Sequence, residues 1–285
     1  MSAAILDGKA LAASRETWCQ ERVSKLKEAG ICPGLSVVLV GEDPASVVYV
    51  RSKEKACERV GIRSFSRHLS AEVSQIELEG VLKELAANPE VHGILLQLPL
   101  PGNLDPVSAI SCIPPEKDVD GFTELSAGKL LNGAQGFRPC TPVGILELIR
   151  QSGIEMDGKH AVVVGRSVIV GKPCAMMLLE QNCTVTICHS HTKNLAEITR
   201  QADILVAATG QAHLITGDMV KPGAVVIDAG IARVNGKLTG DIEPESVKEV
   251  AGFLSPVPGG AGPMTISALL SNTIDAAERL AHGTA

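Results

Sequence analysis

Strand-like runs alternate with helix-like runs along almost the whole of this 285-residue chain. The predicted strands are residues 35–40, 64–68, 93–98, 161–164, 184–188, 204–208 and 224–228. The predicted helices are residues 9–29, 45–60, 74–87, one that begins near 105, 143–151, 171–181, 195–201 and 265–281. Alternation of this kind builds parallel sheets that are covered on both faces by helices. The sequence therefore predicts an α/β fold.

Two segments rich in glycine and proline, residues 133–142 and 256–263, interrupt this rhythm and are predicted hinges. A chain of this length with 45% apolar residues can bury two cores. A helix that follows a hinge needs an apolar partner, so we expect the C-terminal helix to return to the first domain. The predicted domains are residues 1–140 plus 266–285, and a Rossmann-like, doubly wound domain at 141–265.

The run Val162–Pro173, VVVGRSVIVGKP, joins a predicted strand to a predicted helix through a glycine turn. Free N–H groups and the positive end of a dipole at a helix N-terminus attract phosphate. Gly165 permits a sharp turn and Gly171 permits close approach of a ligand. The spacing matches neither the usual dinucleotide fingerprint nor a P-loop, so a tight turn without a ligand stays open as an alternative.

The next predicted strand ends at His189-Ser190-His191-Thr192, where a dinucleotide fold reads the adenosine ribose. An NAD site uses a carboxylate at this point, and the segment contains none. Arg166 can pair with a 2′-phosphate, and Ser190 lies near the same point. The sequence therefore predicts NADP rather than NAD, while His191 is either an added cation or an ordinary surface histidine.

Composition excludes several classes of protein. The formal net charge of −6 argues against nucleic acid and against anionic membranes as partners, and no apolar run is long enough to span a bilayer. The N-terminal residues match neither a signal peptide nor a transit peptide. Eight scattered cysteines without a C-x-x-C pair indicate reduced core cysteines, a cytoplasmic protein and no metal site.

Tyr49 and Lys53 are four residues apart on the predicted helix 45–60, which places both side chains on one face. They form either a pair that contacts a small molecule or an exposed pair on a solvated face. Gln97 lies in an apolar run at the end of a predicted strand. Its amide either finds partners inside the core or faces the crevice where parallel sheets bind ligands.

Two further segments carry candidate binding residues. Asp118 and Asp120 of PEKDVDGF either cap a turn or offer a carboxylate to paired N–H donors of a ring such as an aminopyrimidine. The segment 256–260, PVPGG, is either a rigid wall that a ligand approaches closely, through Pro258 and Gly259, or only a linker.

Eight stretches carry a resemblance that spans nearly the whole chain in one order. They are YVRSKEKACERVGI, GILLQLPLP, IPPEKDVDGF, FRPCTPVGILELI, VVVGRSVIVGKP, VVIDAGI, GKLTGDI and PVPGGAGPMT. Together they resemble the bifunctional methylenetetrahydrofolate dehydrogenase/methenyltetrahydrofolate cyclohydrolase family. Ala229 and Ala261 depart from the valines that are common in that family's pattern.

The resemblance implies a role for each candidate. Lys53 corresponds to the catalytic lysine, Tyr49 to the aromatic residue that packs on the folate, and Gln97 to the glutamine that holds the lysine. The resemblance further assigns Asp120, Pro258 and Gly259 to the substrate, and Arg166, Ser167, Ser190 and Ile231, beside Gly165, to the cofactor. The first domain is then the folate-binding catalytic domain.

The implied activity has two steps. 5,10-methylenetetrahydrofolate is oxidised to the methenyl compound with NADP, and water then converts that compound to 10-formyltetrahydrofolate. Burial and a neighbouring folate cation would favour the neutral amine of Lys53, which suits it to carry a proton. The resemblance also implies one-carbon metabolism, purine biosynthesis and a homodimer. Two rivals are another NADP-linked dehydrogenase with a shikimate-like or hydroxy-acid substrate, and a non-catalytic nucleotide sensor.

Overall fold

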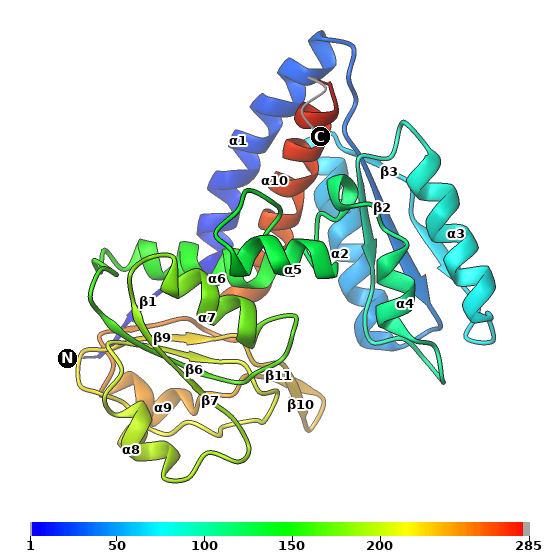
Figure 1. Cartoon of the computed structure of the whole chain (residues 1–285). Coiled ribbons are helices and arrows are strands. Elements are labelled where there is room, and N and C mark those ends of the chain that lie inside the picture. The colour runs from blue at the N-terminus through cyan, green and yellow to red at the C-terminus, as the bar shows by residue number, and fades with distance from the viewer. Residues whose placement is uncertain (1, 282–285) are drawn as a thin grey trace. The chain divides into compact units, whose positions relative to one another are not determined.

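The computed structural model describes residues 2–281, which form two compact units. Unit 1 contains the described residues up to 12 together with 139–265, and unit 2 contains residues 13–138 together with those from 266 onward. Each unit has a parallel sheet with helices on both faces, which confirms the predicted α/β class (Figure 1). None of the helices within residues 2–281 has both the length and the apolarity needed to cross a bilayer.

The sheet of unit 1 has six parallel strands in the order β1-β12-β9-β8-β6-β7. The strands are β1 (Ala4–Ile5), β6 (His160–Val164), β7 (Thr184–Cys188), β8 (Ile204–Ala207), β9 (Val225–Asp228) and β12 (Phe253–Leu254). The helices are α6 (Cys140–Gln151), α7 (Gly171–Leu179), α8 (Leu195–Thr199) and α9 (Pro244–Lys248). A separate hairpin consists of β10 (Ala232–Val234) and β11 (Lys237–Thr239).

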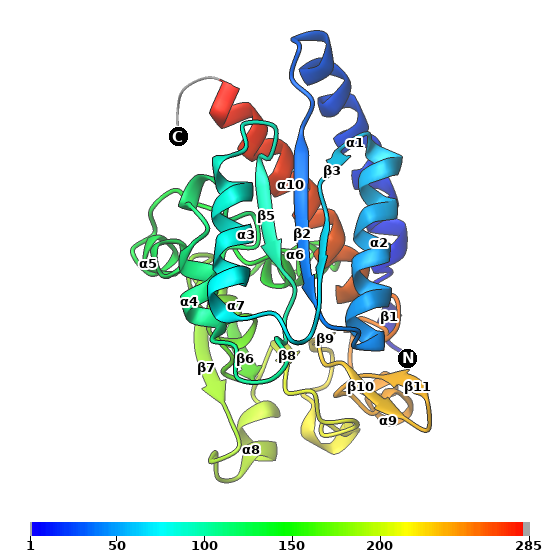
Figure 2. The same ribbon diagram turned by 90° about the vertical axis from the view of Figure 1, so that its right-hand side faces the viewer.

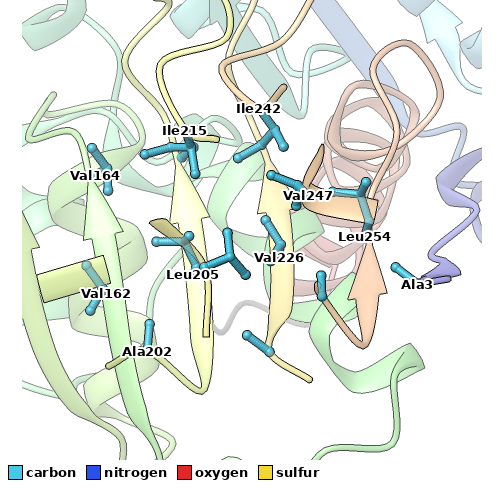
Figure 3. Close-up of a cluster of buried hydrophobic side chains, with 14 of the residues drawn as sticks. Ala3, Val162, Val164, Ala202, Leu205, Ile215, Val226, Ile242, Val247 and Leu254 are labelled. Atoms are coloured by element: carbon cyan, nitrogen blue, oxygen red, sulfur yellow. The ribbon is translucent and has the colours of Figure 1, made fainter. Parts of the chain in front are cut away.

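The core of unit 1 follows from strand periodicity. Alternate residues of a strand point to one face of the sheet, and Val162, Leu205 and Val226 of three neighbouring strands belong to one apolar cluster (Figure 3). Ile215 and Ile242, which are joined by a β-bridge, belong to the same cluster. Helices α6 and α7 cover one face of this sheet, and α8 and α9 cover the other (Figure 1).

The sheet of unit 2 is built around β2 (Gly34–Val40), which pairs in parallel with β3 (Arg63–Ser64), β4 (Arg67–Leu69) and β5 (Gly93–Leu96). Helix α2 (Pro44–Val60) covers one face, and α3 (Gln75–Ala87) and α4 (Pro106–Ser111) cover the other (Figure 2). On the side of α3, its Leu78, Leu82 and Leu85 form a cluster with side chains of β2 and β5. Helix α5 (Glu124–Leu131) completes this part of the chain.

Helices α1 (Gly8–Glu28) and α10 (Ala261–Ala281) each have residues in both units. Within unit 2, Arg22 of α1 forms ion pairs with Asp275 and Glu278 of α10. The Nδ2 atom of Asn272 donates to the carbonyl oxygen of Val119 at 2.8 Å. The C-terminal helix therefore returns to the first part of the chain, as the sequence predicts.

Some predicted boundaries are wrong. The strand predicted at 64–68 is divided into two short strands, β3 and β4. At Phe65, between them, the carbonyl oxygen accepts the side-chain hydroxyl of Ser36 at 3.1 Å, which is not a bond of the sheet ladder. The strand predicted to end at Leu98 ends at Leu96. The last helix begins at Ala261, so the second predicted hinge overlaps its first turn. The sequence analysis missed β1, β12, α5, α9 and the β10–β11 hairpin.

Candidate functional site

A buried lysine is the centre of the predicted catalytic group in unit 2. Helix α2 begins after Asp43, whose side chain accepts the N–H of Ser46, and its first residue is a proline. The helix brings Lys53 one turn beyond Tyr49, with the Lys53 Nζ atom 4.6 Å from the centroid of the tyrosine ring. The same Nζ donates to Oε1 of Gln97 at 3.0 Å. The structure thus brings all three predicted residues together.

The surroundings of this amine suit proton transfer. Lys53 is only 4% exposed, so the alternative of a solvated lysine on an open helix face does not apply. Burial disfavours an ammonium ion, whereas the tyrosine ring face and the Gln97 oxygen stabilise it. Gln97 is itself fixed, because its Nε2 donates to the carbonyl oxygen of Leu98 at 2.8 Å. The amine therefore occupies a defined position from which it can exchange a proton.

The two aspartates of the DVDG segment have different surroundings. Asp118 is buried, and its carboxylate accepts the N–H groups of Phe122 at 3.0 Å and Thr123 at 2.9 Å, and the Ser126 hydroxyl at 2.6 Å. This is the turn-capping role that the sequence left open for the pair. Asp120 is half-buried, two residues further on. Asp118 therefore organises the loop, and Asp120 is the candidate for contact with a ligand.

Strand register brings the predicted cofactor residues to one edge of the sheet of unit 1. The last residues of four neighbouring strands lie opposite one another in register. They are Cys188 of β7, Val164 of β6, Ala207 of β8 and Asp228 of β9. The residues that follow these four strand ends are 189–191, 165–167, 208–210 and 229–231. They share the carboxyl edge, where parallel α/β sheets bind ligands.

The glycine turn after β6 is tightly packed. Gly165 has φ +129°, and a Cβ atom there would lie 2.2 Å from the carbonyl oxygen of Ala208. A Cβ on Gly171 would lie 2.2 Å from the carbonyl oxygen of Gly165. Gly171 is therefore required by the turn itself, which is a role that the sequence analysis did not assign to it. The Ser167 hydroxyl accepts the N–H groups of Val170 and Gly171 at the start of α7.

The remaining cofactor candidates are exposed at the same edge. Arg166 and Ser167 lie on the surface of the turn, and Ile231 is 61% exposed. Ser190 is exposed in a turn where the N–H of His189 donates to the Thr192 hydroxyl at 2.8 Å. These positions leave their side chains accessible to a nucleotide.

The PVPGG segment follows β12, whose register with β9 carries it to the same carboxyl edge. Pro258 is exposed, and Gly259 is buried with φ +115°. The carbonyl oxygen of Gly259 accepts the N–H of Lys9 at 3.1 Å. The segment is therefore tied to α1 within unit 1 rather than being an untethered linker.

Sequence reasoning missed two buried carboxylates at this edge, Asp228 and Asp241, although they lie in the VVIDAGI and GKLTGDI stretches. Strand-end position was the one signal that could have found Asp228. Within residues 2–281, no cluster of three or more histidine, cysteine, aspartate or glutamate residues has the arrangement of a metal site. A cavity of about 310 Å³ in unit 2, lined by Lys129, Phe137 and Arg279 among others, contains none of the predicted site residues.

Two family models match the chain. The model described as "Tetrahydrofolate dehydrogenase/cyclohydrolase, catalytic domain" matches residues 6–120, and the model of the NAD(P)-binding domain of the same family matches residues 139–281. Both halves of the chain therefore match one family.

Similar proteins give the same result over nearly full length. "Bifunctional protein FolD" of Halalkalibacterium halodurans is 56% identical over 98% of this chain and 100% of its own. The FolD methylenetetrahydrofolate dehydrogenase/cyclohydrolase structure from Campylobacter jejuni has a TM-score of 0.96 and 45% identity, with 98% and 100% of the two chains covered. The Trypanosoma brucei enzyme, solved with NADP and an inhibitor, has a TM-score of 0.95 and 39% identity, with 99% of each chain covered. The chain belongs to the tetrahydrofolate dehydrogenase/cyclohydrolase family.

Proposed function

We propose that this protein oxidises 5,10-methylenetetrahydrofolate to 5,10-methenyltetrahydrofolate with NADP, and then hydrolyses the product to 10-formyltetrahydrofolate. The observation that carries the proposal is the buried amine of Lys53, held between the Tyr49 ring and the Gln97 amide. Family membership supplies the substrate class and the cofactor. The two reaction steps, oxidation and hydrolysis, require different things of the protein.

The oxidation needs placement more than acid–base chemistry. The methylene carbon gives a hydride to the nicotinamide of NADP⁺, and the positive charge that remains is shared by the two folate nitrogens. The folate thus stabilises its own product, and NADP supplies the hydride acceptor. The residues of this chain need only hold the two ligands in orientation.

The hydrolysis needs a proton carrier. Water adds to the methenyl carbon and loses a proton, the bond from that carbon to N5 breaks as the hydroxyl proton is transferred to N5, and N10 retains the formyl group. We assign the proton transfer to Lys53, because it is a buried amine whose position Gln97 fixes. Tyr49 is assigned to stacking on the pterin ring.

The binding roles rest on position and on the family resemblance. We assign Asp120 to the pterin N–H donors, and Pro258 and Gly259 to the substrate side of the edge loop. Arg166, Ser167 and Ser190 are assigned to the phosphates of NADP beside the Gly165 turn, and the backbone of Ile231 to the nicotinamide side. Their exposure at one sheet edge supports this assignment for the cofactor residues.

Three further statements are part of the proposal. A homodimer and a supply of one-carbon units for purine biosynthesis rest on the resemblance alone. A cytoplasmic, reducing location is supported by eight cysteines that are all free.

The test uses the purified chain in two assays. Methylenetetrahydrofolate with NADP⁺ is followed by NADPH absorbance, and supplied methenyltetrahydrofolate is followed by the loss of its own absorbance without cofactor. Lys53→Met should lower the hydrolysis rate by about 10²–10⁴-fold, the usual contribution of a general acid–base residue. Equal hydrolysis by variant and parent would remove Lys53 from the mechanism, and an inactive parent would refute the function.

A further inference from the structure

Two buried aspartates lie at the base of the β10–β11 hairpin, at the edge where the cofactor is proposed to bind. Asp228 is the last residue of β9 and is 3% exposed, and Asp241 follows the hairpin and is fully buried. Between them the chain passes through Ile231 and the hairpin and then returns. Neither carboxylate forms an ion pair with any residue among 2–281.

Asp228 accepts hydrogen bonds from both ends of the segment 230–242, which contains Ile231. Its Oδ1 accepts the N–H of Gly230 and the N–H of Asp241, each at 3.0 Å, and its Oδ2 accepts the N–H of Ile242 at 3.0 Å. The packing is close, because a Cβ atom on Gly240 would lie 1.9 Å from Asp228 Oδ2. The backbone at Ile231 is therefore fixed by a single carboxylate.

Asp241 fastens the neighbouring loop to the same segment. Its Oδ2 accepts the N–H and the hydroxyl of Thr209 and the N–H of Gly210, the last two at 2.8 and 3.2 Å. A Cβ atom on Gly210 would lie 3.7 Å from the carbonyl oxygen of Ile231, so the two loops lie against each other. The loop after β8 and the loop after β9 thus form one connected surface.

The arrangement is costly for a purely structural device. The other oxygen of Asp241, Oδ1, is buried and has no hydrogen-bond partner among the described residues. Burial raises the pKa of Asp228 to about 6, even though three backbone N–H groups stabilise its charged form. Buried carboxylates without a cation destabilise a fold unless they are fully satisfied.

We propose that Asp228 and Asp241 are positioning residues for the oxidation step. They hold the backbone of Thr209–Gly210 and of Ile231 in the arrangement that receives the nicotinamide half of NADP. The inference rests on the proposed function, and specifically on Ile231 as a contact to the cofactor. The hydrolysis of methenyltetrahydrofolate uses no nicotinamide, so the two activities of one protein separate this role from a general role in folding.

The experiment compares Asp241→Ala, Asp241→Asn and Thr209→Val with the parent enzyme. Asp241→Ala removes the acceptor of three donors, and we expect kcat/KM for NADP⁺ in the oxidation to fall about 10- to 100-fold, as for a misplaced reactant. Asp241→Asn keeps an acceptor oxygen and should therefore retain most of the parent's kcat/KM for NADP⁺. Thr209→Val removes one hydroxyl donor and should show a smaller loss. Hydrolysis of supplied methenyltetrahydrofolate should stay within twofold of the parent in all three.

The matched control is Asp203→Asn. Asp203 is also in unit 1, but it accepts the N–H of His160 and pairs with Lys221 at the opposite edge of the sheet. It should change neither activity. A second readout is the deuterium isotope effect on the oxidation with substrate deuterated at the methylene carbon, which should rise in Asp241→Ala because hydride transfer becomes slower than the other steps.

Parallel loss of both activities in the Asp241 variants, or unchanged oxidation in all variants, would overturn the inference. If Asp241→Ala does not fold, the ratio of oxidation to hydrolysis activity is compared in Asp241→Asn and Thr209→Val instead, and the same outcomes apply. A parent enzyme without oxidation activity would instead refute the proposed function, before any variant is compared.

Discussion

The turn between β6 and α7 gives a prediction whose size can be worked from the structure. In Gly171→Ala, the new Cβ would lie 2.2 Å from the carbonyl oxygen of Gly165, 2.5 Å from its carbonyl carbon and 2.8 Å from the nitrogen of Arg166. All three atoms belong to the backbone, so no side chain can rotate away. Relief to the 3.4 Å of ordinary contact needs a shift of about 1.2 Å between the turn and the helix.

Such overpacking costs about 1–3 kcal/mol. A loss near 2 kcal/mol would lower the Tm by about 4–8 °C in a domain of this size. Opening the turn also displaces Arg166 and Ser167. Loss of one charge-assisted contact to phosphate costs about 1.5–3 kcal/mol, so we expect the affinity for NADP to fall roughly 10- to 100-fold. Thermal unfolding and titration calorimetry with NADP⁺ measure the two effects.

Gly80→Ala is the matched control. Gly80 lies inside α3, and a Cβ atom there meets nothing within 4 Å. Alanine should therefore stabilise that helix by about 0.5–1 kcal/mol and leave NADP binding unchanged. A Gly171→Ala protein with the Tm and NADP affinity of the parent would refute the assignment of this turn.

Three further predictions each concern a single residue. Arg166→Ala should weaken binding of NADP far more than that of NAD, and equal losses in a titration with both cofactors would show that Arg166 does not contact the 2′-phosphate. Burial, and to a smaller extent the charge of Lys117, lower the pKa of His92, and its Nδ1 accepts the N–H of Gly34. The folded state therefore protonates His92 less readily than the unfolded state does. Stability should therefore fall as the pH decreases through about 6.5, and urea unfolding of His92→Gln should show less of that fall. Asp118→Ala removes the acceptor of three donors and should lower the free energy of unfolding by about 3 kcal/mol, measured in urea. It should also loosen the loop that contains Asp120, the proposed folate contact, and so raise KM for the folate.

Local patterns were sufficient for much of the fold. The four-residue spacing of Tyr49 and Lys53 predicts their shared helix face, and the glycine turn after β6 is visible as a strand that runs into a helix. The polar amide of Gln97 at the end of an apolar run was also informative, since only a ligand or a buried partner can satisfy it. In the structure that partner is the amine of Lys53, 44 positions away in sequence.

Other features depend on chain pairing that no local pattern records. The Asp228–Asp241 contacts form only when the β10–β11 hairpin closes and returns the chain beside the end of β9. Strands β1 and β12 have two residues each and are too short to show periodicity.

Unit 1 is built from two separate segments of the chain, which matters for any attempt to express it alone. Strand β1 comes from the first residues, yet it forms one border of a sheet whose other strands start only at His160. A fragment cut at residue 139 would lose that border strand and expose the β12 backbone, which invites strand-to-strand aggregation. A soluble nucleotide-binding fragment should therefore require the N-terminal dozen residues to be grafted back, for example through a circular permutation.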